Sequence, residues 1–229
     1  MATGTDLTLE LQDPDVLSEE EESRLLRGAP WRRFVVVGDS VARGLGERID
    51  GYGRESWGER VANAIRRESR AVEYLNLGQP DALAHEVRRE QIEPAVDFGP
   101  DLAALVCGGN DLLNEKLDTD GLEEDLDAIV GALAGTGADV VTYTMYDIAK
   151  ALKLPPEFGA ELDSRLEELY ALVRRTSRRH GAILVELTKA PVSADPGIYS
   201  RDFKHGNTRG QAIAASLTIR ELGRHLGNT

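Results

Sequence analysis

Short apolar runs alternate with longer segments of helical periodicity, and this alternation restricts the fold more than any other feature of the sequence. Strands that are separated by crossover helices lie parallel in one sheet. The apolar runs predict five such strands, at residues 34–37, 72–77, 102–107, 140–145 and 183–187. The helical patterns lie near residues 57–68, 82–92, 121–134, 160–180 and 208–226. We therefore predict an α/β fold with a five-stranded parallel sheet.

The chain has 229 residues, which is enough for one α/β domain with a sizeable core. We place that domain at residues 31–229. The first thirty residues carry eight acidic side chains against Arg24 and Arg27, and they show little apolar periodicity before Leu25. This pattern is typical of a solvated, partly disordered extension, and the alternative is a docking segment for a partner.

The charge balance and the lack of targeting signals restrict the partners. With 27 basic and 40 acidic side chains, the formal net charge is −13, which would repel a phosphate backbone. Residues 1–30 lack the pattern of a signal peptide, and no stretch has the length of apolar sequence that a membrane span needs. We expect a cytoplasmic protein with no nucleic-acid or membrane partner. The histidines are scattered and Cys107 is the only cysteine, so no metal site is predicted.

The first predicted strand ends on Gly38-Asp39-Ser40, a turn that presents a serine hydroxyl where ligands bind in parallel sheets. A serine is a weak nucleophile until a base takes its proton, and that base needs an orienting acceptor. His205 lies in a loop before the last helical pattern, three residues after Asp202. This spacing lets one short segment carry both the base and the carboxylate.

Three blocks of sequence resemble the signature of the SGNH hydrolases, also called GDSL esterases/lipases. They are Gly38-Asp39-Ser40, Gly108-x-Asn110-Asp111 and Asp202-x-x-His205. The resemblance spans roughly residues 33–226 and implies a three-layer α/β/α sandwich. It implies that Ser40 attacks an acyl carbonyl, that His205 is the general base and then acid, and that Asp202 orients His205. It further implies a small-molecule acyl substrate and no cofactor.

The resemblance also implies an oxyanion hole, and here the sequence departs from the family pattern. The backbone N–H of Ser40 and the side-chain amide of Asn110 are two implied donors. The third is usually a glycine N–H about five residues after an asparagine, but the position after Asn76 holds Asp81. Either the backbone N–H of Asp81 still donates, or its carboxylate opposes the oxyanion. Gly78 is a less favoured donor.

Four further residues are candidate substrate contacts: Asp39, Tyr52, Trp57 and Gly109. Loop support is the simpler role for Asp39, and core packing is an equal alternative for Trp57. We expect a serine hydrolase that acts on an ester, thioester or acetyl group of a small to medium-sized substrate. Because of Asp81, two alternatives stay open: a specialised acyltransferase or rearrangement enzyme, and a member that binds a ligand without turnover.

Overall fold

The computed structural model describes residues 7–69, 71–113, 117–153 and 155–228, and within them it confirms the predicted α/β sandwich. The sheet has the order β2-β1-β3-β4-β5, and every pairing is parallel. Its strands are β1 (Arg33–Gly38), β2 (Glu73–Asn76), β3 (Leu102–Val106), β4 (Asp139–Thr144) and β5 (Ile183–Glu186).

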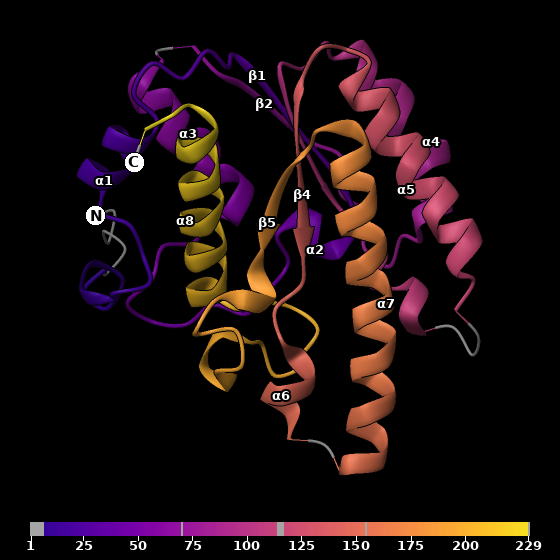
Figure 1. The fold of residues 1–229 in the computed structure, drawn as a ribbon. Coiled ribbons are helices and arrows are strands. Elements are labelled where there is room, and N and C mark those ends of the chain that lie inside the picture. The colour runs from indigo at the N-terminus through magenta and orange to yellow at the C-terminus, as the bar shows by residue number, and fades with distance from the viewer. Residues whose placement is uncertain (1–6, 70, 114–116, 154, 229) are drawn as a thin grey trace.

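Helices cover both faces of the sheet. Figure 1 shows α1, α3 and α8 on one side and α4, α5 and α7 on the other. The helices are α1 (Glu19–Leu25), α2 (Ser40–Arg43), α3 (Trp57–Glu68), α4 (Ala84–Asp97), α5 (Thr119–Ala134), α6 (Ile148–Leu152), α7 (Pro156–His180) and α8 (Thr208–His225). In the described part of the chain, no helix combines the length and the apolar character needed to cross a bilayer.

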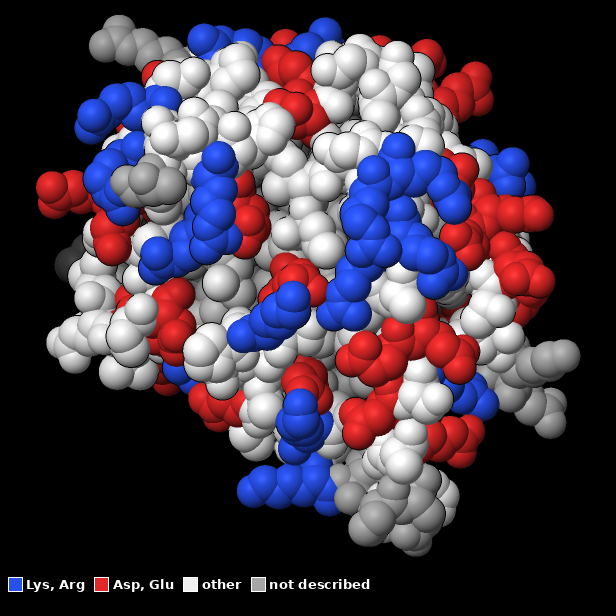
Figure 2. Space-filling model, in the orientation of Figure 1, with Lys and Arg blue, Asp and Glu red and all other residues white. Residues whose placement is uncertain are grey.

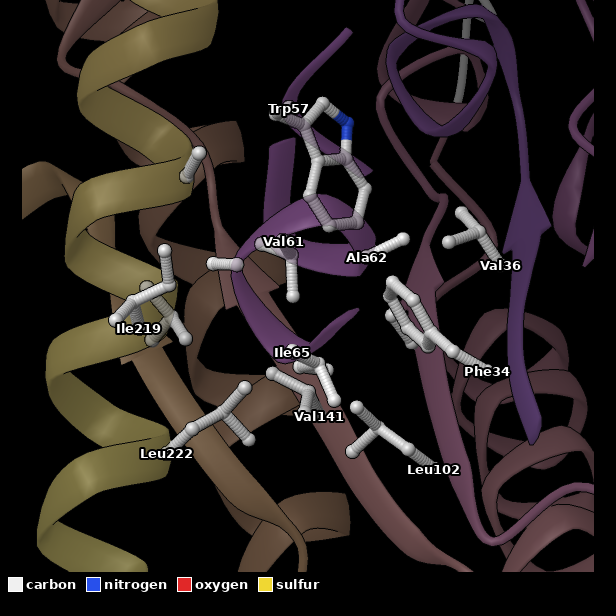
Figure 3. Packing of buried hydrophobic residues seen from close by; sticks show 14 of the residues in the cluster. Phe34, Val36, Trp57, Val61, Ala62, Ile65, Leu102, Val141, Ile219 and Leu222 are labelled. Carbon is white, nitrogen blue, oxygen red and sulfur yellow. The ribbon is translucent and has the colours of Figure 1, made fainter. Parts of the chain in front are cut away.

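The apolar runs form strands because both sheet faces are buried. In β1 and β3 nearly every residue is buried, which requires continuous apolar sequence and not alternation. Figure 3 shows part of one hydrophobic core, to which Phe34 and Leu102 from the sheet, Ile65 of α3 and Leu222 of α8 belong. Gly38 at the end of β1 pairs with Val106 at the end of β3. The loops that follow these two strands therefore start at the same edge.

The N-terminal segment is folded against this core, which corrects the prediction of a solvated, partly disordered extension. Leu17, Leu25 and Leu26 are buried in the core between α1, α3 and α8. Helix α1 begins with a capping box formed by Ser18 and Glu21. Sequence analysis did not identify these buried positions, because they are few and irregularly spaced among acidic residues. Residues 1–6 of the predicted extension lie outside the described residues.

A cluster of charges around the buried side chain of Asp13 ties this segment to the start of α8. The side chain of Asp13 is only 3% exposed, and its Oδ2 lies 2.7 Å from Nε of Arg209. The same oxygen accepts a 2.6 Å hydrogen bond from the hydroxyl of Tyr52. Asp195 pairs with the other side of the Arg209 guanidinium at 2.7 Å. Burial raises the pKa of Asp13, but the hydrogen bonds from Arg209 and Tyr52 outweigh burial and lower it overall.

We expect Asp13→Ala to reduce the free energy of unfolding by about 2 kcal/mol, because it leaves a buried hydroxyl and an arginine N–H without their acceptor. Urea denaturation measures this loss. Asp15→Ala is the matched control: Asp15 is 35% exposed and 3.6 Å from Arg209, so its removal should cost less than about 0.5 kcal/mol. Equal losses in the two variants would contradict a specific role for Asp13.

Charged side chains of both signs share the visible surface. Figure 2 shows Lys and Arg side chains interleaved with Asp and Glu over the face seen in Figure 1. Ion pairs are common in the described part of the chain, such as Arg175 with Glu123 at 2.7 Å and Arg179 with Asp127 at 2.6 Å. Exposed pairs of this kind stabilise a fold only slightly. On this face, the excess of acidic residues is therefore distributed and does not form a single acidic field.

Candidate active site

The serine stands on a tight turn that only glycine can enter. Gly38 has φ 136°, and a Cβ atom there would lie 1.8 Å from the carbonyl oxygen of Val106. Asp39 follows as the N-cap of α2 and accepts a 2.8 Å hydrogen bond from the N–H of Val41. Ser40 is the first residue of α2 and is 8% exposed. The turn thus fixes the serine at the carboxyl edge of the sheet.

Gln91 of α4 clamps the same turn, and sequence analysis missed it. Its side chain is 2% exposed; Oε1 accepts from the N–H of Gly38 at 2.8 Å and Nε2 donates to the carbonyl of Gly38 at 2.9 Å. Both polar groups of the glutamine are thereby satisfied in an otherwise apolar core. A glutamine on the buried face of a helix is the signal that could have identified it.

The structure brings Ser40, His205 and Asp202 into one hydrogen-bonded chain. Nε2 of His205 lies 2.8 Å from the hydroxyl of Ser40, and its Nδ1 lies 2.7 Å from Oδ2 of Asp202. With the ring proton on Nδ1, Nε2 is free to accept the serine proton. Oδ1 of Asp202 accepts from the N–H groups of Lys204 and His205. Burial raises the pKa of Asp202, but these hydrogen bonds, above all that from the His205 ring, lower it overall and keep the carboxylate ionised.

Neighbouring loops hold the segment that carries His205. The carbonyl of His205 accepts a 2.8 Å hydrogen bond from the N–H of Ser200, and Tyr199 and Gly206 form an antiparallel bridge. The hydroxyl of Ser200 in turn accepts from the N–H of Glu47 at 2.8 Å. The segment is therefore anchored on both sides of the histidine, which fixes the ring relative to Ser40.

Three N–H groups on the loops that follow β1, β2 and β3 are the candidate donors of an oxyanion hole. Within the described residues, the backbone N–H groups of Ser40 and Asp81 donate to no protein acceptor. Asp81 has φ 60° and an exposed side chain, so an aspartate occupies the left-handed conformation that usually favours glycine. Asn110 donates to the carbonyl of Ala82 at 3.0 Å, which orients its amide and joins the two loops. Among the described residues, the second amide hydrogen of Asn110 has no acceptor.

Gly78 does not have the role of a donor. Its N–H is bonded to Oδ1 of Asn76 at 2.9 Å. A Cβ atom at Gly78 would lie 2.5 Å from the backbone nitrogen of Arg43 and 2.9 Å from the carbonyl oxygen of Asp39. The absence of a side chain therefore lets β2 and its loop pass closely beside α2, and the glycine serves packing.

Asp39 is a buried support of the turn and does not face a substrate. It is 4% exposed, and burial raises its pKa to about 6 in spite of its hydrogen bonds from the backbone of α2. Burial, together with the nearby Asp39 carboxylate, also raises the pKa of the Cys107 thiol. The cysteine is thus held as an unreactive thiol.

The remaining candidates for substrate contact have different outcomes. Tyr52 is 7% exposed and its hydroxyl donates to Asp13, so it anchors the N-terminal segment, and a substrate contact by Tyr52 stays a prediction. Trp57 is both a core residue and a wall of a small pocket, and its Nε1 donates to the carbonyl of Val41. Gly109 lies against Met145, whose sulfur would be 3.2 Å from a Cβ at Gly109. Among the described residues, no three metal-ligating side chains converge on one point.

A parallel sheet that carries a hydrogen-bonded serine, histidine and aspartate at its carboxyl edge is the arrangement of serine hydrolases. The model of the GDSL-like lipase/acylhydrolase family matches residues 36–213, so the chain belongs to this family and the protein is an ester-hydrolysing enzyme. The comparison with curated proteins gives no match.

Solved structures share the fold at low sequence identity. A lipase/acylhydrolase from Enterococcus faecalis is 19% identical, with a TM-score of 0.65 over 85% of this chain and 96% of that one. TesA is 19% identical, with a TM-score of 0.67 over 83% and 98% of the two chains. A catalytic mutant of the acetylxylan esterase Axe2 from Geobacillus stearothermophilus is 15% identical, with a TM-score of 0.67 over 86% and 95%.

Proposed function

We propose that this enzyme hydrolyses small esters or thioesters through an acyl-enzyme formed on Ser40. The observation that carries the proposal is the pair of contacts at His205, 2.8 Å to the Ser40 hydroxyl and 2.7 Å to the Asp202 carboxylate. A base must lie within hydrogen-bond reach of the proton that it takes, and its other nitrogen must be oriented. Both conditions are met at His205.

The reaction would proceed in two halves. The Ser40 oxygen attacks the acyl carbon while His205 takes the hydroxyl proton at Nε2. The oxyanion accepts hydrogen bonds from the N–H groups of Ser40, Asp81 and Asn110, each of which contributes about 3 kcal/mol when preorganised. His205 then gives the proton to the leaving oxygen or sulfur. A water molecule attacks the acyl-enzyme, His205 takes its proton, and the same proton returns to Ser40 as the acid leaves.

Labelling by a fluorophosphonate, together with turnover of p-nitrophenyl acetate, tests the proposal on the wild-type protein. We expect both stoichiometric labelling and steady turnover. A protein that labels but turns over only with an added alcohol would support the acyltransferase alternative. A protein that does neither would favour a member that binds its ligand without turnover.

Asp81 gives a separate prediction about the oxyanion hole. We expect Asp81→Gly and Asp81→Asn both to raise kcat/KM for p-nitrophenyl acetate about threefold to tenfold, because either change removes a negative charge near the developing oxyanion. Glycine and asparagine both adopt a φ of 60° readily, so the backbone N–H of residue 81 should stay in place. Asp81→Ala is the control. Alanine also removes the charge, but unlike glycine and asparagine it is strained at a φ of 60°. If glycine and asparagine both reduced the rate tenfold or more, the carboxylate would take part in the chemistry.

A further inference from the structure

A pocket of about 60 Å³ is lined by residues that directly neighbour Ser40 and His205 in sequence. Val41, the residue after the serine, lines one side of it. Lys204 and Gly206, which flank the histidine, line another side. The pocket is therefore contiguous with the residues that would carry the reaction. It lies on the side of α8, whereas the Asn110 and Asp81 donors lie on the loops after β3 and β2.

Apolar, closely packed side chains form part of the pocket wall. Trp57, Tyr143 and Ala214 line it and are 3%, 7% and 8% exposed. The rings of Trp57 and Tyr143 pack with their centroids 5.1 Å apart, and the indole N–H is fixed by its 2.8 Å bond to the carbonyl of Val41. Close-packed walls of this kind do not move aside for an additional methylene group without strain. The volume of the pocket thus sets an upper limit on what enters.

Met145 connects the pocket to the oxyanion side of the site. It lines the pocket, and its sulfur would lie 3.2 Å from a Cβ atom placed on Gly109. Gly109 directly precedes Asn110. A carbonyl group held between Ser40 and Asn110 therefore has the flexible side chain of Met145 between itself and the pocket. A chain attached to the acyl carbon would pass this methionine as it entered.

We infer that this pocket receives the acyl chain of the substrate and limits it to short chains; the inference rests on the proposed function. A volume of about 60 Å³ has room for about four to six water-sized groups, which matches acetyl to butyryl chains and not octanoyl. The acyl group is the better occupant because it stays attached to Ser40 after the alcohol has left. An alcohol held in a narrow pocket would leave more slowly, which would delay attack by water.

A chain-length series of p-nitrophenyl esters tests the inference. In the wild type, kcat/KM for the octanoate should be at least tenfold below that for the butyrate. Ala214→Val fills part of the pocket and should lower kcat/KM for the butyrate about tenfold relative to the acetate. Met145→Ala widens the entrance and should raise kcat/KM for the octanoate relative to that for the butyrate. Ala134→Val makes the same change on α5, across the sheet, and should leave every ratio unchanged.

The outcomes separate this inference from the proposed function. If no ester is hydrolysed and no probe is bound, the proposed function itself fails. If esters are hydrolysed but neither Ala214→Val nor Met145→Ala changes the chain-length ratios, the pocket assignment is overturned. Acetate esters of methanol, butanol and octanol form the second series. If Ala214→Val and Met145→Ala changed the kcat/KM ratios only in this alcohol series, the alcohol would occupy the pocket and the acyl assignment would be overturned.

Discussion

Ser40→Ala is expected to abolish covalent labelling by a fluorophosphonate and to lower kcat for p-nitrophenyl acetate by about 10⁵-fold or more. The hydroxyl 2.8 Å from Nε2 of His205 is the only group in this contact that can form the acyl-enzyme. Without it, the histidine and the oxyanion donors can only assist direct attack by water. Single-turnover kinetics with intact-protein mass spectrometry would measure both effects.

His205→Ala should have nearly the same effect as Ser40→Ala, and the double variant should be no worse than either. This lack of additivity is expected because the serine and the histidine act in one step. Ser193→Ala is the control: its hydroxyl donates to the carbonyl of Thr188, away from the histidine, so labelling should be retained. Full labelling of the Ser40→Ala protein would place the nucleophile elsewhere.

Asp39→Asn is expected to stabilise the protein at pH 8 while it slows ester hydrolysis. Burial raises the pKa of Asp39 from 3.8 to about 6, so the folded protein binds this proton more tightly than the unfolded chain does. The stability of the wild type therefore falls as the pH rises from about 4 to about 6, and the loss is complete above pH 6. Asparagine keeps the N-cap and removes the buried charge, with a gain of up to about 3 kcal/mol at pH 8.

Urea denaturation at pH 4 and pH 8 would measure this gain, which should be small at pH 4. Asp81→Asn makes the same change in charge at an exposed position and should show no such dependence on pH. We expect kcat of Asp39→Asn to fall severalfold, because the change removes a negative charge from the turn that carries Ser40, where positive charge develops on His205 during attack. A variant that is no more stable at pH 8 would contradict a buried ionised Asp39.

The sequence alone predicts the sheet, because strands buried on both faces are continuous apolar runs whose boundaries are clear. The family blocks likewise predict Ser40, Asn110, Asp202 and His205 as neighbours. The predicted end of the helix after the second strand is less accurate: the pattern near residues 82–92 stops before Pro94, but α4 continues to Asp97. Proline usually disfavours a helix interior because it lacks an N–H and has a fixed φ. Tertiary packing can override this preference, as it does in α4.

Contacts between distant parts of the chain could not be predicted from local pattern. Tyr52 lies shortly after the serine in sequence, yet its hydroxyl is taken by Asp13 of the N-terminal segment. The role of Gln91 depends on which face of α4 is turned toward Gly38. Nothing in either residue's neighbours along the chain identifies these partners, because the pairings arise only when the layers are assembled.

The pairing of Asp13 with Arg209 has a consequence for how the enzyme is made. These two residues are 196 positions apart, so the N-terminal segment reaches its site only after α8 has left the ribosome. Asn228 also donates to the carbonyls of Leu25 and Arg27, which joins the segment to the region beyond α8. Contacts of such high sequence separation slow folding. We therefore expect the serine and the histidine to meet late, so that a nascent chain stays inactive at least until α8 has been made.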